Sequence, residues 1–400
     1  MALTLSNKAQ AVKPSSTLAI TAKAKELKAQ GIDVVGFGAG EPDFNTPDNI
    51  NQAAIQAIHA GFTKYTPASG TLELKQAISQ KFKTFNHLDY APEQIVISNG
   101  GKHSLINVFA AILNPGDEVL IPSPYWLSYP EMVKLQDGIP VDVPTKQENG
   151  YKVTVAELEA AFTDKTKALV LNSPCNPTGM LYTKEELEAI ADFIVKKDIY
   201  VVSDEMYEYL TYDGAEHISI GSLNKDIFDR TITVSGVSKS YSMTGWRIGY
   251  TGSSLEIAKL MGSIQSHSAS NPNSIAQKAA LEAINGPQDQ VQYMNEQFNI
   301  RRKYMVDRIA KMPALTCVEP KGAFYVFLDV TKAVAMKYKG EVVGSAAKLA
   351  DIMINDFNVA LVPCEDFGID NHVRLSYAIS LESIEKGLDR LEEFLNTLEA

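Results

Sequence analysis

The chain has 400 residues, of which 45% are hydrophobic and 21% charged, and its formal net charge is −11. This length exceeds what one hydrophobic core usually holds, so we expect one large and one smaller domain, and the composition excludes wholesale disorder. The negative charge gives no basic footprint for nucleic acid or an anionic membrane, and three widely spaced cysteines form neither a disulfide framework nor a zinc cluster.

The N-terminal residues, MALTLSNKAQAVKPSST, lack the apolar core of a secretion signal. The most apolar stretch, 106–113, is too short to span a bilayer and is typical of a buried helix. We therefore expect a cytoplasmic protein with neither membrane nor nucleic-acid partners.

Strand-like and helix-like segments alternate between residues 94 and 250. The apolar runs predict strands over 94–98, 118–121, 167–172, 200–203 and 231–235. Helices are predicted to begin near Gly100, Thr154 and Thr183, the last two with a Thr-x-x-Glu capping box. Near-continuous apolar strands separated by helices predict an α/β fold whose mostly parallel sheet is covered by helices on both faces.

The C-terminal third has a different pattern. A long charged helix carries Arg301 and Arg302, strands are predicted over 323–328 and 373–378, and a closing helix follows Ser380. This order predicts a smaller α+β domain. We expect a large domain over 47–290, a small C-terminal domain over 291–400, and an N-terminal arm, 1–46, that completes the small domain.

Two glycine clusters differ in what they predict. GFGAG at 36–40 lacks the GxGxxG spacing and runs into Glu41-Pro42-Asp43, which disfavours dinucleotide binding, and the chain has no Walker A sequence. SNGGKHSL at 98–105 follows a strand and begins a helix, so the N–H groups of Gly101 and Lys102 can face an anion. The alternative for this second cluster is a plain strand-to-helix turn.

Polar residues also stand at predicted strand ends, where open α/β sheets bind ligands. Asp204 ends IYVVSDE, and Asn176 lies in the proline-rich loop NSPCNPTG. The alternative to a ligand-binding role is, for Asp204, a solvated carboxylate at the start of a loop and, for Asn176, a loop with a purely structural role. Lys239 follows a strand among small residues, conditions that favour a neutral, nucleophilic amine.

Arginine is used sparingly, at seven of the 37 basic positions. Arg247 and Arg374 stand beside short apolar runs, where the forked guanidinium suits a phosphate or carboxylate; structural ion pairs are the alternative. The six histidines show no metal-ligand spacing, and no GxSxG sequence occurs. A metal-dependent or hydrolytic mechanism is therefore not predicted.

Together these clusters resemble the class I pyridoxal-phosphate-dependent aminotransferases of fold type I, specifically the bacterial aspartate aminotransferase branch. Ten segments carry the resemblance, in order over nearly the whole chain: KPSST, GAGEPDF, YTPASG, SNGGKHSL, PYWLSYPEM, NSPCNPTG, VSDEMYE, SKSYSMTGWRIGY, GAFYV and HVRLSYA. The resemblance implies a large domain with a mostly parallel sheet, a smaller α+β domain, pyridoxal 5′-phosphate as cofactor, and a homodimer with shared active sites. It implies ping-pong conversion of L-aspartate and 2-oxoglutarate to oxaloacetate and L-glutamate.

The resemblance also implies roles around the cofactor ring. Lys239 would form the imine with the cofactor aldehyde and then move the proton, while Asp204 would keep the ring nitrogen protonated. Asn176 and Tyr207 would hydrogen-bond the phenolic oxygen, and Trp126 would stack on the ring. Asn176 and Trp126 are expected to contact the substrate as well.

The phosphate and the substrate would be held by further groups. The amides near Gly101 and Lys102, with Arg247, would bind the phosphate, and Tyr65 would reach it from a neighbouring subunit. Arg374 would bind the substrate α-carboxylate, assisted by the Gly40 backbone.

Two departures from the animal-type branch accompany this resemblance. A phosphate-contacting serine of that branch is replaced by Gly236, so Ser235 or Ser238 is the candidate substitute. The stretch that would supply an arginine for the distal carboxylate, 263–271, has no Arg or Lys. The bacterial branch instead uses the lysine of its GGK segment, so the resemblance implies that dicarboxylate specificity depends on Lys102, a point charge with weaker geometric demands than arginine.

Three other functions are compatible with parts of this pattern. Members of the resembled branch can also act on prephenate, so the resemblance implies an aromatic or prephenate aminotransferase, as principal or additional activity, and associates Lys13 of the N-terminal arm with it. A ligand-sensing regulator would need a fused DNA-binding segment, for which the start of GAGEPDF at Gly38 leaves no room. A catalytically inactive homologue is disfavoured because Lys239, Asp204 and Arg374 are all present.

Overall fold

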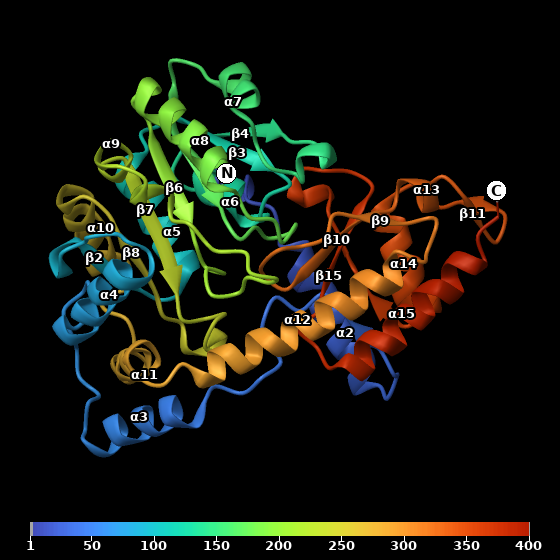
Figure 1. Ribbon diagram of the computed structural model, residues 1–400, viewed down its shortest axis with the longest axis horizontal. Coiled ribbons are helices and arrows are strands. Elements are labelled where there is room, and N and C mark those ends of the chain that lie inside the picture. The colour runs from blue at the N-terminus through green and yellow to red at the C-terminus, as the bar shows by residue number, and fades with distance from the viewer. Residues whose placement is uncertain (1–2, 400) are drawn as a thin grey trace.

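Residues 3–399 are described by a computed structural model, in which two main sheets each carry their own helices (Figure 1). The strands of the larger sheet are β2 (Ile95–Ser98), β3 (Glu118–Ser123), β4 (Ile139–Pro144), β5 (Thr166–Asn172), β6 (Tyr200–Asp204), β7 (Thr231–Gly236) and β8 (Gly249–Gly252). Their order is β2-β8-β7-β6-β5-β3-β4. The strands from β7 to β4 are parallel, whereas β8 runs antiparallel to both of its neighbours.

The sheet confirms the predicted α/β class and adds two strands that the sequence pattern does not predict. β4 has the sequence IPVDVP and lies at the edge of the sheet, where its prolines remove no ladder hydrogen bond from a central strand. β8 has the sequence GYTG, and a side chain on Gly252 would meet the Tyr90 ring. Proline and glycine both weaken strand signals, which is why neither segment stands out.

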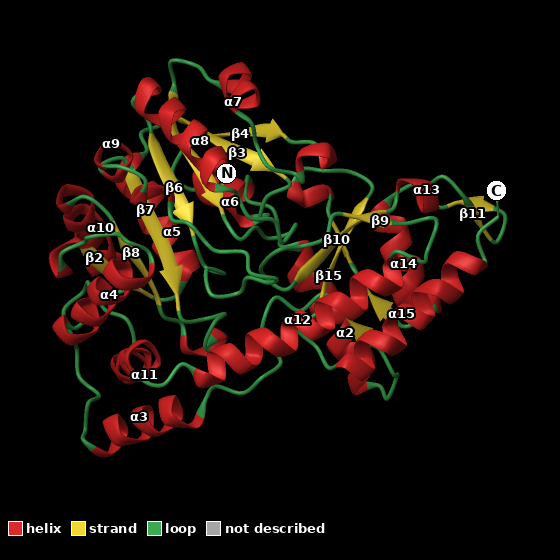
Figure 2. Cartoon of the chain, viewed as in Figure 1, coloured by secondary structure: helices red, strands yellow, loops and turns green. Residues whose placement is uncertain are grey.

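Helices cover both faces of the large sheet (Figure 2). One face packs on α5 (Gly101–Ile112), α6 (Ser128–Lys134) and α10 (Leu255–Ser268). The other face packs on α7 (Val155–Ala161), α8 (Lys184–Lys197) and α9 (Lys225–Phe228). Val201 and Val202 of β6 belong to opposite cores, as the alternation of side chains along a strand requires. Both faces are thus buried, and the strands are apolar throughout.

A third group of helices flanks the β2 end of the sheet: α3 (Asp48–His59), α4 (Leu72–Phe85) and α11 (Ser274–Asn285). The predicted capping boxes open α7 and α8, where Thr154 pairs with Glu157 and Thr183 with Glu186. No helix in residues 3–399 is long and apolar enough to cross a membrane.

The smaller sheet contains β9 (Thr316–Cys317), β10 (Tyr325–Asp329), β14 (Val362–Pro363) and β15 (His372–Ser376), antiparallel in the order β14-β15-β10-β9. The helices of this part are α2 (Ser16–Ala29), α12 (Asp289–Ile309), α13 (Thr331–Val334), α14 (Ala346–Asp356) and α15 (Leu381–Asn396). Figure 1 shows α12 running from the α11 side of the molecule into the smaller unit. β10 begins two residues later than predicted, since Ala323 has a left-handed φ of 57° that interrupts extended backbone.

The N-terminal arm begins with the short helix α1 (Asn7–Gln10) and joins the smaller unit through β1 (Val35–Gly36), which pairs in parallel with β13 (Val359–Ala360). A two-residue hairpin pair, β11 (Lys337–Tyr338) and β12 (Glu341–Val342), completes the strands. The expected boundaries at residues 46 and 290 fall just before α3 and at the start of α12, and they stay a prediction.

Candidate active site

A cavity of about 370 Å³ lies between the carboxyl ends of the large-sheet strands and the smaller sheet. Asp204 ends β6, Lys239 follows β7 and Arg374 lies in β15. Ten of the twelve sequence-predicted site residues line this cavity: Gly40, Gly101, Lys102, Trp126, Asn176, Asp204, Tyr207, Lys239, Arg247 and Arg374. Parallel strands bring residues that are distant in sequence to one edge of the sheet, which explains why these groups converge.

Asp204 is a buried carboxylate, with only 5% of its surface exposed. The Tyr129 hydroxyl donates to Oδ2 across 2.6 Å, and the Met206 backbone N–H donates to Oδ1 across 3.2 Å. Burial raises the pKa of Asp204 to about 6, while the two hydrogen bonds act in the opposite direction. A cationic group placed against this carboxylate would therefore be strongly stabilised.

Lys239 supplies an amine at the centre of the cavity. Its Nζ donates to the carbonyl oxygen of Gly40, which comes from the N-terminal arm. Burial, reinforced by the positive charge of Arg374, lowers the pKa of Lys239 to about 8. A much larger fraction of neutral amine is thus present near neutral pH than for an exposed lysine, and the neutral amine is the nucleophilic form.

Tyr207 and Tyr325 approach the cavity from the two main parts of the chain. Their hydroxyl groups lie 2.9 Å apart, within hydrogen-bond distance. Burial raises the pKa of Tyr207 well above its usual value, so the phenol remains protonated and available as a donor.

Arg374 is a buried guanidinium, with 2% of its surface exposed. It donates to Asn176 Oδ1 across 2.9 Å and to the Gly38 carbonyl oxygen across 3.2 Å, and it lies over the Tyr325 ring at 4.4 Å. Both oxygens are neutral, and the buried Nε has no hydrogen-bond partner. Because a buried charge needs compensation, this guanidinium is suited to bind an anionic ligand such as a carboxylate.

A second part of the cavity lining is suited to bind an anion. Arg247 has a φ of 58° and is anchored by Nη1 to the Thr244 carbonyl oxygen across 2.8 Å. The N-terminus of α5 begins at Gly101, and a side chain at Gly100 would collide with the Arg247 guanidinium. Lys102 lies 4.9 Å from the centre of the Trp126 ring. Free helix N–H groups and two cations together favour a phosphate-like group.

Two predicted residues lie away from this cavity. Tyr65 is 90% exposed, and its predicted contact across a subunit interface stays a prediction. The Lys13 side chain is exposed, and its backbone N–H donates to Glu131 Oε2 across 3.0 Å. This bond places the N-terminal arm against α6, and Ser15 and Thr17 further along the arm line the cavity.

The cavity also contains functional groups that the sequence analysis does not single out. Tyr129 and Tyr325 orient Asp204 and Tyr207 respectively. Tyr129 lies in PYWLSYPEM, close to Trp126, but no sequence spacing connects it to a carboxylate 75 positions away. Of the two candidate serines for the phosphate, Ser238 lines the cavity, whereas Ser235 does not and donates to Glu208. Further lining residues outside the predicted set are Ser15, Thr17, Leu18, Leu105, Leu127, Ser128, Asn172, Met206 and Thr244.

Comparison with known proteins places these features in a family context. Residues 32–391 match the family model described as aminotransferase class I and II. An aspartate aminotransferase from Bacillus sp. strain YM-2 is 50% identical over 98% of this chain and 99% of that protein. An aspartate/prephenate aminotransferase from Cereibacter sphaeroides is 45% identical over 98% of each chain. The crystal structure of the aspartate aminotransferase from Rhizobium meliloti is 38% identical, with a TM-score of 0.96 over 100% of both chains.

Proposed function

Because the chain belongs to the aminotransferase class I and II family and has its type I fold, we propose that it transfers the amino group of L-aspartate to 2-oxoglutarate. The products are oxaloacetate and L-glutamate, and the two half-reactions alternate on one site. The observation that carries this proposal is the meeting of Lys239, Asp204 and Arg374 at one cavity, in a chain 50% identical to an aspartate aminotransferase.

The donor set of the cavity fits pyridoxal 5′-phosphate. When bound, this cofactor supplies an aldehyde and an electron-accepting ring. Arg247 and the N-terminus of α5 suit its phosphate, Asp204 suits a protonated ring nitrogen, and Lys239 suits the aldehyde. Gly249 of β8 allows the start of α5 to lie close to this strand, since a side chain on Gly249 would collide with the Gly101 backbone nitrogen.

Asp204 would keep the ring nitrogen of the bound cofactor protonated by means of its negative charge. A cation at hydrogen-bond distance would lower the pKa of Asp204 from its value of about 6, as the Lys239 charge already does in part. The Tyr129 hydroxyl fixes the carboxylate orientation. Asn176, Tyr207 and Trp126 would hold the remaining edges and one face of the ring.

Lys239 would move the proton of the reaction. With a pKa of about 8, Nζ would accept the proton from the substrate Cα without a large energetic cost and hold it for return. Gly40 supports this role, because its carbonyl oxygen accepts a hydrogen bond from Nζ and so restricts where the amine lies.

Arg374 would bind the substrate α-carboxylate, which supplies the charge its neutral partners lack. Lys102 would bind the distal carboxylate. Burial and the nearby Arg247 charge lower the pKa of Lys102, and a second carboxylate beside it would reverse that effect. We expect a preference for dicarboxylates from this pair of cations, which line the same cavity.

The experiment that tests the function is an absorption titration of the purified protein with L-aspartate in the absence of any keto acid. The visible cofactor band is expected to convert to a near-ultraviolet band at low aspartate and only at far higher phenylalanine. A visible band that aspartate leaves unchanged would contradict the aspartate assignment while leaving cofactor binding intact.

A second activity, on prephenate, is favoured by one comparison. The relative from Cereibacter sphaeroides is named an aspartate/prephenate aminotransferase, and the N-terminal arm bearing Lys13 lies against α6 beside the cavity. Lys13→Ala is expected to lower prephenate turnover and leave aspartate turnover unchanged. Equal losses on both substrates would remove the specific role of Lys13.

The assembly is part of the same proposal. We expect a homodimer in the cytoplasm, with the exposed Tyr65 of each copy reaching the phosphate region of the other. Tyr65→Phe is then expected to weaken cofactor binding in the dimer. Sedimentation of the holoenzyme as a monomer would contradict this arrangement.

A further inference from the structure

A buried polar network lies directly behind the end of β6. We use the name strap for residues 205–219, which follow Asp204 and lead into the turn η3 (Ile220–Ser222). Strap side chains divide between two surroundings. Tyr207 and Tyr212 belong to the apolar core of the small sheet, whereas Glu205 and Glu208 bond to groups of the large domain. The strap therefore connects the two main parts of the chain.

The small-domain side of the strap is held by hydrogen bonds beside the cavity. The Ala323 backbone N–H donates to the Leu210 carbonyl oxygen across 2.9 Å. The Tyr207 and Tyr325 hydroxyl groups lie 2.9 Å apart. A displacement of the strap would therefore move the Tyr207 phenol relative to the cavity.

The large-domain side of the strap is anchored at Glu208, which is 2% exposed. The Lys81 ammonium, from α4, donates to Oε1 of Glu208 and, across 2.8 Å, to Asn86 Oδ1. Ser235 Oγ donates to the same carboxylate across 2.5 Å, and Asn86 Nδ2 donates to its other oxygen across 2.7 Å. Lys81 itself is 6% exposed, so this ion pair is screened little by water.

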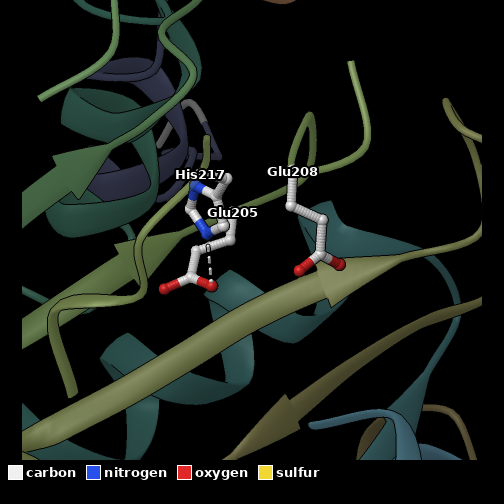
Figure 3. A group of neighbouring side chains, drawn as sticks. All are labelled: Glu205, Glu208 and His217. Carbon is white, nitrogen blue, oxygen red and sulfur yellow. Dashed lines mark hydrogen bonds and ion pairs between the residues drawn. The ribbon is translucent and has the colours of Figure 1, made fainter. Parts of the chain in front are cut away.

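Glu205, the first residue of the strap, is hydrogen-bonded to residues at the other end of the strap. Ser203 Oγ donates to Oε1 across 2.8 Å, and Ser219 Oγ donates to Oε2 across 2.6 Å. His217 Nε2 lies 2.9 Å from Oε2, as the dashed line in Figure 3 marks. Asn86 Nδ2, which also bonds Glu208, is 3.0 Å from Oε2. The first and last residues of the strap thus meet at one buried carboxylate.

These contacts distinguish the cluster from a metal site. Glu205, Glu208 and His217 offer ligand atoms within 4.8 Å of one another (Figure 3). However, each of the four carboxylate oxygens already accepts a hydrogen bond, and the Lys81 ammonium supplies positive charge inside the cluster. The donors already present satisfy these carboxylates without an ion, so the cluster is a structural anchor.

We propose that Lys81 and Glu208 are positioning residues of the active site, whose ion pair holds the strap so that Tyr207 lies at the cavity. The inference rests on the proposed function in one respect, that Tyr207 hydrogen-bonds the cofactor's phenolic oxygen. Removing the Lys81 ammonium leaves Glu208 without its charged partner in a buried site. The strap then shifts to hydrate the carboxylate, and the Tyr207 phenol moves with it.

The test is a double-mutant cycle on the holoenzyme with Lys81→Met, Tyr207→Phe and the combination. The readouts are kcat per bound cofactor and the pH at which the visible cofactor band changes. Lys81→Met is expected to lower kcat roughly tenfold and to move the transition pH in the same direction as Tyr207→Phe. In the Tyr207→Phe background it is expected to cause no further shift, because both changes act through one phenol.

A matched control is Lys152→Met, which removes the lysine of the Lys152–Glu186 pair in the same domain and is expected to leave both readouts unchanged. If Lys81→Met fails to fold, Glu208→Gln enters the same cycle in its place, because it breaks the ion pair by leaving the buried Lys81 ammonium without its carboxylate, and a shift in the same direction is expected. The proposal would be overturned if the changes caused by Lys81→Met and Tyr207→Phe added up in the combined variant. It would also be overturned if Lys81→Met lowered the thermal stability but left kcat and the transition pH unchanged. The transition pH requires no substrate, so an enzyme inactive on aspartate would refute the proposed function without deciding the role of Lys81.

Discussion

The Tyr129 hydroxyl donates a 2.6 Å hydrogen bond to Oδ2 of Asp204, joining α6 to the end of β6 in the interior of the large domain. Both residues are buried, with 1% and 5% of their surfaces exposed. Burial alone would favour the neutral carboxyl group, and the hydroxyl donor opposes that tendency by stabilising the ionised form. The carboxylate therefore depends on Tyr129 for both its charge and its orientation.

Tyr129→Phe is expected to raise the pKa of Asp204 and weaken cofactor binding at least tenfold, which corresponds to the lower end of the roughly 1.5–3 kcal/mol of a hydrogen bond to a charged group. Fluorescence titration of the apoprotein with the cofactor measures the change. Tyr338→Phe is a matched control, because it removes a tyrosine–aspartate hydrogen bond, to Asp356, on the surface of the small domain. Equal affinities for Tyr129→Phe and the unaltered protein would exclude this role.

Arg374→Ala is expected to reduce kcat/KM for all amino-acid substrates alike. The corresponding loss of transition-state stabilisation is roughly 1.5–3 kcal/mol, the contribution of a charge-assisted pair. The reason is that every such substrate carries an α-carboxylate, whatever its side chain. Steady-state kinetics with aspartate, glutamate and phenylalanine measure the losses. Arg308→Ala, which removes the partner of Asp389 and Glu392, is the control. A loss confined to dicarboxylates would show that Arg374 binds the distal group instead.

Lys102→Met is expected to penalise aspartate more than alanine or phenylalanine, because only aspartate brings a second carboxylate to this side of the cavity. Methionine keeps the length of the side chain beside Trp126 while removing the charge. The ratio of kcat/KM values for aspartate and phenylalanine is the decisive measurement. A ratio that stays constant would remove Lys102 from substrate selection.

The pH dependence of Lys239 is expected to be visible in the apoprotein. Its pKa of about 8 predicts that reaction with an amine-directed reagent rises through pH 8, far below the usual lysine range. Arg374→Gln removes a positive charge that lowers this pKa, so the midpoint is expected to move to higher pH. Peptide mapping of the labelled protein at a series of pH values gives the midpoint. An unchanged midpoint would mean that the Arg374 charge does not contribute to the lowered pKa of Lys239.

Local signals explain why much of the fold is predictable. The capping boxes at Thr154 and Thr183 and the apolar run ending at Asp204 need only neighbouring residues to be recognised, and the structure has the corresponding helices and strand. β8 is different, because its four residues include two glycines whose role depends on Tyr90 and Gly101 packing against them. Such a contact has no local signature.

The same distinction applies to the candidate site. Lys239, Asp204 and Arg374 stand in strongly patterned segments, and the cavity brings them together. Lys81 and Glu208, by contrast, are 127 positions apart, and in sequence each is an ordinary charged residue of a helix or loop. Their burial and pairing follow from how α4 packs beside the strap, which neither propensity nor periodicity reports.

The reversed direction of β8 has a mechanical consequence. The loop 237–248 leaves β7 and returns directly along the adjacent strand, so Lys239 and Arg247 are carried on a single hairpin connection. Arg374 lies instead on the smaller sheet. Rotation of the smaller sheet would change the position of Arg374 relative to a substrate carboxylate. The distance between the Lys239 amine and the Arg247 guanidinium, both on the hairpin, would stay constant. The hairpin would thus keep Lys239 and Arg247 in a fixed relative position, and the smaller sheet would move Arg374 relative to them.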